Sequence, residues 1–152
     1  MIIAIDPGNK ESAYVILSED LRPIEFAKLP NEELMEVLDK QAKVYGCVVI
    51  ECIASYGMSV GQTVFDTCIW IGRFTERAKA IGAEVNYIYR KEEKMNLCHT
   101  MKAKDSNVSQ ALRDRFGEKG TKKNKGWFYG FKADVWQAYA VGVTYHDLYI
   151  KK

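Results

Sequence analysis

The sequence predicts an α/β protein with a mixed five-stranded sheet and helices on both faces. Three apolar runs come first and are separated only by turns, which is typical of antiparallel strands. Later apolar runs alternate with helical patterns, which favours parallel strands joined by crossover helices. A chain of 152 residues suits one domain with its own core. We therefore expect a single domain over residues 1–152 in the order β-β-β-α-β-α-β-α-α.

The first three strands are expected to form an antiparallel meander. Met1–Asp6 is an apolar run that ends in an acid, and the Pro7-Gly8-Asn9 sequence behind it predicts a sharp turn. Ala13–Leu17 predicts the second strand. Leu21–Leu29 predicts the third, and its proline suits an edge of the sheet better than its centre.

A helix, a buried strand and a long helix are expected next. Asn31 can cap a helix that Gly46 ends. Cys47–Ile50 is a continuous apolar run, the kind that is buried on both faces of a sheet. After a glycine-containing loop at Ser55–Gly61, the pattern over Gln62–Ile81 predicts a long helix. That helix is apolar enough to supply a dimer interface, although a place in the core explains its residues equally well.

The second half of the chain adds one strand and further helices. In order, we expect a strand at Val85–Tyr89, a helical turn or short helix at Arg90–Met101, a helix capped by Asp105 or Ser106 and ended by Gly117, a loop at Gly117–Gly130 and a final helix at Ala133–Tyr149. The loop contains four glycines and four lysines. It therefore places a basic, conformationally free segment directly before the last helix.

The net charge of +2 conceals an asymmetry along the chain. Residues 1–85 carry 8 basic and 13 acidic residues, net −5, whereas residues 86–132 carry 12 and 5, net +7. The basic segment suggests a polyanionic partner, although an unevenly charged solvated surface has the same composition. No apolar run approaches the ~20 residues of a membrane span. Asp6 interrupts any signal-peptide core, so we expect the chain in the cytoplasm.

The four cysteines are expected to be buried free thiols. They stand at positions 47, 52, 68 and 98, form no C-x-x-C pair, and three of them lie in apolar stretches. The two histidines are too few and too scattered for a zinc site.

Three acids are candidates for a shared metal site. Asp6 and Glu51 each follow a buried strand, so both carboxylates emerge at one sheet edge if those strands are parallel neighbours ~4.8 Å apart. Asp134 stands near the start of the last helix and reaches the same point if that helix crosses the edge. Each acid alone also fits a turn, a loop or a helix start. Together they favour Mg²⁺ or Mn²⁺, which prefer oxygen ligands.

Such a cluster predicts hydrolysis of a phosphodiester. Three carboxylates bring a charge of about −3, and two divalent ions would leave room for phosphate oxygens. In that arrangement one ion activates a water molecule and the other stabilises the leaving 3′ oxygen. We therefore expect two metal ions for each active site and no organic cofactor.

Three motifs carry a resemblance to a known family. They are Ile5-Asp6-Pro7-Gly8, Val49-Ile50-Glu51 and Lys132-Ala133-Asp134-Val135-Trp136-Gln137-Ala138-Tyr139-Ala140. With residues 54–74 and 120–130, they make nearly the whole chain resemble the RuvC-like Holliday-junction resolvases of the RNase H-like superfamily, most of all the compact phage-encoded branch. The resemblance implies an RNase H-like fold, Mg²⁺-dependent cleavage of four-way DNA junctions by a homodimer, and location in a bacterial host cell. It also implies that Asp6, Glu51 and Asp134 are metal ligands.

The chain departs from the family pattern at one position. Cellular members usually carry a second aspartate three residues after the helix acid, where this chain has Gln137. Gln137 would share a helix face with Asp134, and its amide oxygen could bind a metal or position a water molecule, but it cannot act as a base. Lys94 falls where the family tends to have an active-site lysine, which would offset charge in the transition state. Lys94 could equally be a solvated surface residue.

Further side chains are expected to contact DNA. Tyr56, in the loop after Glu51, could stack at a junction or pack on the protein itself. The aromatic residues Trp127–Tyr129 could stack on bases, although an anchor for the loop is the better interpretation. Candidate phosphate contacts, each of which could also be a solvated lysine, are Lys91, Lys102, Lys104, Lys119, Lys122, Lys123, Lys125 and Lys132.

The sequence thus predicts a Mg²⁺-dependent endonuclease that resolves Holliday junctions or other branched DNA. One alternative is a related RNase H-like nuclease that acts on flaps or RNA-containing substrates. Another is a catalytically idle DNA-binding module, which the missing fourth acid would support. An actin-like ATPase opens with a similar strand and turn, but it needs two lobes and well over twice this length.

Overall fold

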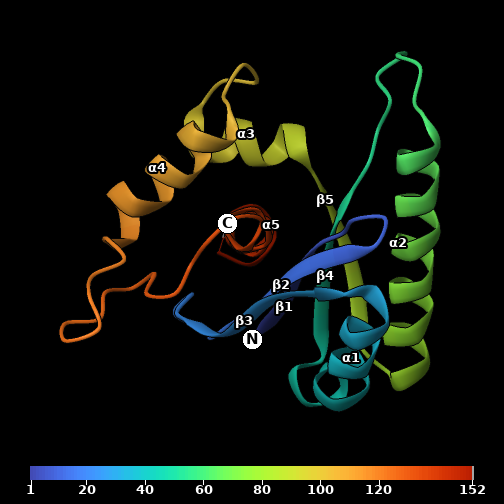
Figure 1. Ribbon diagram of the computed structural model, residues 1–152, viewed down its shortest axis with the longest axis horizontal. Helices are drawn as coiled ribbons and strands as arrows, with labels where there is room; N and C mark the ends of the chain where they lie inside the picture. The colour runs from blue at the N-terminus through green and yellow to red at the C-terminus, as the bar shows by residue number, and fades with distance from the viewer. Residues whose placement is uncertain (152) are drawn as a thin grey trace.

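The computed structural model describes residues 1–151, which contain a five-stranded sheet in the order β3-β2-β1-β4-β5 (Figure 1). The strands are β1 (Ile2–Asp6), β2 (Glu11–Leu17), β3 (Pro23–Pro30), β4 (Cys47–Cys52) and β5 (Glu84–Tyr89). The first three are antiparallel, while β1, β4 and β5 are parallel to one another. The predicted mixed sheet is therefore confirmed, including the edge position of the proline-containing strand.

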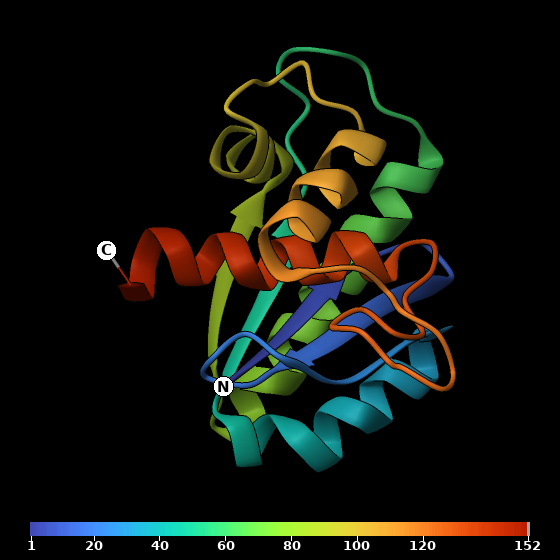
Figure 2. The same cartoon turned by 90° about the vertical axis from the view of Figure 1, so that its left-hand side faces the viewer.

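Helices cover both faces of the sheet, as predicted. The helices are α1 (Asn31–Tyr45), α2 (Gln62–Ile81), α3 (Arg90–Cys98), α4 (Asp105–Phe116) and α5 (Val135–Tyr145), followed by a π-helical segment at His146–Lys151. Because side chains alternate along β1, Ile3 and Ile5 pack with α1 and α2 on one face and Ala4 packs with α4 and α5 on the other. Figure 2 shows α5 crossing the strands. This crossing carries the start of α5 towards the sheet edge where β1 ends.

The turn after β1 is fixed by a buried hydrogen-bond network. The Asn31 side chain accepts a hydrogen bond from Ser12 Oγ at 2.6 Å and donates one to the Gly8 carbonyl at 3.0 Å, and the Gly8 N–H donates to Ser12 Oγ at 3.0 Å. The prediction that Asn31 caps α1 is wrong: Pro30 precedes the helix, and Asn31 is its first residue. A side chain at Gly8 would lie 2.2 Å from the Glu11 carbonyl oxygen, so only glycine fits there. The network holds the backbone directly behind Asp6.

Two other helix ends differ from the sequence expectations. Lys104, rather than Asp105 or Ser106, precedes α4, because Asp105 is already helical and pairs with Arg90. The final helix changes to π-helical geometry at His146, where Asp147 accepts hydrogen bonds from Arg115 of α4 at 2.6 and 2.9 Å and from Asn96 of α3 at 2.9 Å. These bonds hold the end of the chain against α3 and α4.

The outer face of α2 is apolar and exposed. Phe65 is 54% exposed and Ile69 is 60% exposed, so these residues are not part of the core. Cys68 lies on the same face and is exposed, and the other three cysteines are half-buried, so the expectation of buried thiols is wrong. All four cysteines of the described region are free, as expected. Within residues 1–151, no helix is both long and apolar enough to cross a membrane.

Candidate active site

The carboxyl ends of three parallel strands meet at one edge of the sheet. Ile5 of β1 lies opposite Ile50 of β4, so Asp6 and Glu51 are the next residues of neighbouring strands. Cys52 lies opposite Tyr89 at the end of β5, which places Arg90 at the same edge. Asp6 is partly buried and Glu51 is only 8% exposed. The structure therefore brings together the two acids that the strand pattern singled out.

Asp134 joins them from the start of α5. It is the residue that precedes the helix, and its Oδ2 lies 2.7 Å from Lys28 Nζ of β3. Lys28 is aligned with Asp6 across the sheet, because Asp6 lies opposite Ala13 and Ala13 lies opposite Lys28. Asp134 is near enough to Asp6 for its charge to affect the titration of Asp6. The third predicted acid thus faces the same sheet edge.

Burial and crowding of the acids raise the pKa of Asp6 to about 8. Burial is the largest cause, and the negative charges of Glu51, Asp134 and Asp105 add to it, while Arg90 opposes it. Desolvation and like charges both disfavour an ionised carboxyl group. A bound cation would remove this penalty, so the electrostatics of the edge favour a positive ligand.

Arg90 connects most of the polar groups at this edge. Its guanidinium lies 3.6 Å from Glu51 Oε1 and pairs with Asp105 at the start of α4. With the amide of Gln137 oriented to present its oxygen, that oxygen accepts hydrogen bonds from Arg90 Nη1 at 3.0 Å and Nη2 at 3.2 Å. Gln137 is buried, and its amide oxygen is occupied by the hydrogen bonds from Arg90 in this structure.

Glu93 is a further acid at the site. It lies on α3, its side chain is 0% exposed, and neither of its carboxylate oxygens has a hydrogen-bond partner within residues 1–151. Glu51 Oε2 is also buried without a partner in the described region. Burial, followed by the charge and contact of Glu51, raises the pKa of Glu93 well above its usual range. These orphaned oxygens fit a hard cation, which prefers carboxylate ligands.

Glu51 and Asp134 form salt bridges with basic side chains, and the acids are not arranged as a metal coordination shell. Within residues 1–151, no three Asp, Glu, His or Cys side chains lie close enough together to hold a metal ion. Asp134 instead pairs with Lys28, and Glu51 pairs with Arg90. The carboxylates would have to leave these two cations in order to converge on a metal ion.

Sequence reasoning missed four residues at this edge, although some had a signal. Arg90 directly follows a parallel strand, and Asp6 and Glu51 lie at the ends of two others, so the same rule would have placed Arg90 here. Glu93 is three residues further along α3, on the same face. Lys28 and Asp105 required the strand register and the position of α4, which the sequence pattern does not specify.

Lys94 lines a pocket that shares Arg90 with the acidic site. A pocket next to the edge is lined by Tyr56, Arg90, Lys91, Lys94 and Met101, so Arg90 belongs both to this pocket and to the acidic site. Tyr56 is 61% exposed, and Lys91 Nζ lies 5.9 Å from the centre of its ring. Tyr56 is therefore available to a ligand instead of being buried against the protein.

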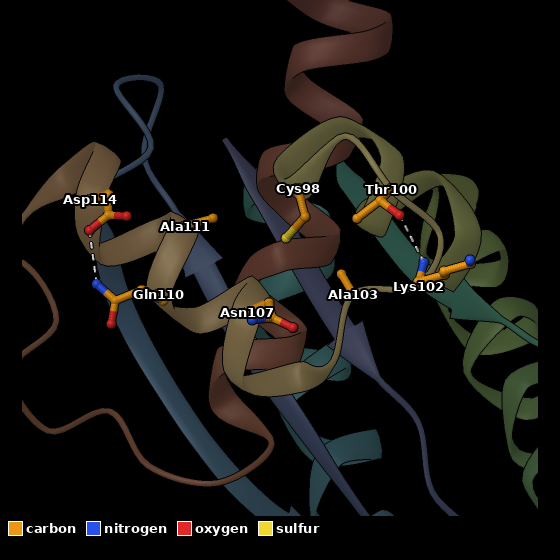
Figure 3. Close-up of a pocket in the computed structure, with 8 residues that line it drawn as sticks. All are labelled: Cys98, Thr100, Lys102, Ala103, Asn107, Gln110, Ala111 and Asp114. Atoms are coloured by element: carbon orange, nitrogen blue, oxygen red, sulfur yellow. Dashed lines mark hydrogen bonds between the residues drawn. The ribbon is translucent and has the colours of Figure 1, made fainter.

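The remaining predicted DNA contacts divide into two groups. Lys102 and Lys104 lie between α3 and α4, and Figure 3 shows Lys102 with Thr100 at the opposite end of a pocket from Gln110 and Asp114. Exposed lysines in the loop that leads to Asp134 form the second group, namely Lys119, Lys122, Lys123, Lys125 and Lys132. We name Lys122, Lys123 and Lys125 the lysine loop.

Aromatic residues behind the lysine loop anchor it. Phe128 is fully buried and packs against Phe131 and Tyr139. The Trp127 indole donates a hydrogen bond to the Tyr139 hydroxyl at 3.1 Å. The anchoring role preferred from the sequence therefore fits Phe128 and Trp127, which are engaged with the protein itself.

The arrangement predicts a pH-dependent stability when divalent metal is removed. The folded pKa of Asp6 is about 8, above the unfolded value near 4, so between these values the folded state binds more protons. The stabilisation is complete below the unfolded pKa and is lost as the pH rises towards 8. We expect the free energy of unfolding in chelator to fall by up to about 1.4 kcal/mol per pH unit from pH 5 to 8.

Urea denaturation at several pH values measures this slope. D6N should make it shallower, whereas D66N, which changes a half-buried aspartate on α2, should leave it unchanged. Equal slopes in D6N and the wild type would contradict the assignment of the buried charge to Asp6.

Comparison with known proteins identifies the fold. The structure is similar to Thermus thermophilus RuvC, with a TM-score of 0.66, 15% sequence identity and coverage of 95% of this chain and 92% of that one. It is also similar to T. thermophilus RuvC in complex with a Holliday junction substrate, with a TM-score of 0.68, 14% identity and coverage of 95% and 91%. No protein-family model matches the sequence, and no curated protein sequence matches it.

These similarities establish the class of fold. The chain has an RNase H-like fold, as the sequence predicted. Within that class, its arrangement is the one seen in the structures of RuvC, over nearly the full length of both chains.

Proposed function

We propose that this chain is a divalent-metal-dependent endonuclease that cleaves branched DNA, with four-way junctions as its preferred substrate. The observation that carries the proposal is the placement of Asp6 and Glu51 at the ends of adjacent parallel strands, with Asp134 facing them from α5, in a RuvC-like fold. Acids at the carboxyl ends of strands mark ligand sites in open α/β sheets.

Asp6, Glu51 and Asp134 would hold the Mg²⁺ or Mn²⁺ ions, two for each active site. When bound, the ions would supply an activated water molecule and charge stabilisation at the phosphate. Arg90 and Lys28 are the cations that now pair with these acids, and both are partly exposed. Once released from the acids, their side chains can donate hydrogen bonds to phosphate oxygens, because guanidinium and ammonium groups bind phosphate well. Lys94 lies in the adjoining pocket and would add positive charge there.

DNA would extend from the acidic edge over the basic segment. Tyr56 and Lys91 adjoin the edge, and the lysine loop leads directly into Asp134. The apolar outer face of α2, with Phe65 and Ile69 exposed, supports a homodimer with two active sites. A dimer would allow two strands of one junction to be cut symmetrically.

The catalytically idle alternative also has an observation in its favour. Gln137 is bound to Arg90, and Glu51 and Asp134 are paired with basic side chains. A module that binds DNA without cleaving it would keep such pairs permanently.

A substrate panel decides between these functions. The wild-type protein is incubated with synthetic four-way junctions, flaps, RNA–DNA hybrids and linear duplexes of matched sequence, with Mg²⁺ or with chelator. We expect Mg²⁺-dependent incision of the four-way junction ahead of the other substrates. Preferred cleavage of hybrids or flaps would support the related nuclease, and binding without incision in any metal would support the idle module.

A further inference from the structure

Glu93 is buried against another acid, Glu51, and within residues 1–151 no basic or hydrogen-bond-donating group is bonded to its carboxylate. It belongs to the second turn of α3, four residues after Tyr89, and its side chain is directed towards Glu51 at the sheet edge. Its carboxylate is fully inaccessible, and both oxygens lack a donor from any part of residues 1–151. The nearest acidic group, Glu51, also has one buried oxygen without a partner.

An unpartnered acid at this position destabilises the apo protein. Burying a polar group without a hydrogen bond costs roughly 1–3 kcal/mol by protein mutational data, and a buried charge costs more. An apolar side chain of similar size would pack there without that cost. Arg90 is the nearest cation, and its guanidinium is already divided among Glu51, Asp105 and Gln137. Either a further positive charge or a proton held between Glu93 and Glu51 is therefore needed to compensate the buried pair.

We propose that Glu93 is the fourth carboxylate of the metal site. It takes the place of the aspartate that RuvC-like resolvases usually carry at the position of Gln137. This inference rests on the proposed function, because it assumes that Asp6, Glu51 and Asp134 bind the metal. Gln137 cannot supply charge, and its amide oxygen is engaged by Arg90. Glu93 belongs to α3, which follows β5, and its side chain is in contact with Glu51, so it brings a second carboxyl group to the one at the end of β4.

The test is metal binding by the full-length protein without DNA. Mn²⁺ is titrated into the wild type, E93Q and E36Q by calorimetry. Glu36 is an exposed residue of α1, so E36Q makes the same chemical change away from the sheet edge. We expect E93Q to bind Mn²⁺ about 10- to 100-fold more weakly than the wild type, and E36Q to bind as the wild type does. E93M, which keeps the side-chain volume, serves if the amide variant does not fold.

Thermal unfolding in chelator separates a metal role from a purely structural one. E93Q should melt at the same temperature as the wild type or higher, since it removes a carboxyl group without a partner. Lower Tm in chelator would show that Glu93 stabilises the fold itself and would overturn the proposal.

D6N distinguishes failure of this inference from failure of the proposed function. If D6N loses Mn²⁺ binding while E93Q binds as the wild type does, the role of Glu93 is overturned and the metal site at Asp6 remains. If the wild type binds no Mn²⁺, both proposals are overturned. Loss of binding in both D6N and E93Q supports both.

Discussion

D6N is expected to lose junction cleavage while it keeps junction binding and gains stability. Asp6 lies at the end of β1 and is the acid whose pKa is raised to about 8 by burial and by Glu51, Asp134 and Asp105. An asparagine has nearly the same shape but no charge, so it weakens the hold on a divalent ion without disturbing the turn that Gly8, Ser12 and Asn31 fix. Loss of several kcal/mol of transition-state stabilisation corresponds to a rate about 10³-fold lower.

Single-turnover cleavage of a labelled four-way junction in Mg²⁺ measures the rate, and gel retardation in Ca²⁺ measures the affinity. D66N is the matched control, because it makes the same change at a half-buried position of α2 and should cleave normally. E51Q should also lose cleavage and keep binding. If D6N cleaves at the wild-type rate, the acidic edge is not the active site; if D6N loses binding and cleavage together, Asp6 acts on the fold or the DNA surface.

The sheet and the pair of strand-end acids could be predicted because both depend on local patterns. An apolar run that ends in an acid shows where β1 and β4 stop, and the order of hairpin strands and crossover helices leaves few ways to arrange them. Asp6 and Glu51 are then neighbours by geometry alone. Asp134 required only that α5 cross the sheet, which the apolar composition of that helix favours.

The surroundings of the acids could not be predicted because they depend on register and on competing partners. Asn31 has the composition of a helix cap, yet its side chain has better partners at Ser12 and Gly8, which are distant in sequence. Lys28 reaches Asp134 only because of the pairing of β2 with β3. Glu93 has the appearance of an ordinary helix acid, and its burial is evident only when α3 is placed against the sheet edge.

Replacing the three residues of the lysine loop with alanine is expected to weaken DNA binding and flatten its salt dependence. Lys122, Lys123 and Lys125 are exposed, and the buried Phe128 anchors the segment that leads from them to Asp134. Each phosphate that a lysine neutralises releases counterions, with a slope of about −0.9 in log affinity against log salt per contact. Removal of three contacts should make the slope shallower by up to about 2.7 units. Affinity for four-way junctions and linear duplex should fall together, because phosphate contacts do not read branch structure.

Fluorescence anisotropy measures the DNA affinity at salt concentrations from about 50 to about 300 mM, with Ca²⁺ in place of Mg²⁺ to prevent cleavage. Over this range the screening of interactions between charges increases. The matched control replaces Lys40, Lys43 and Lys79, which are exposed on α1 and α2, over the opposite face of the sheet. That variant removes the same charge from the protein, so an equal flattening in both would mean that net charge alone governs association. A slope that stays at the wild-type value in the loop variant would place the DNA on another surface. Only a selective loss in the loop variant agrees with DNA that runs from the acidic edge along the segment preceding Asp134.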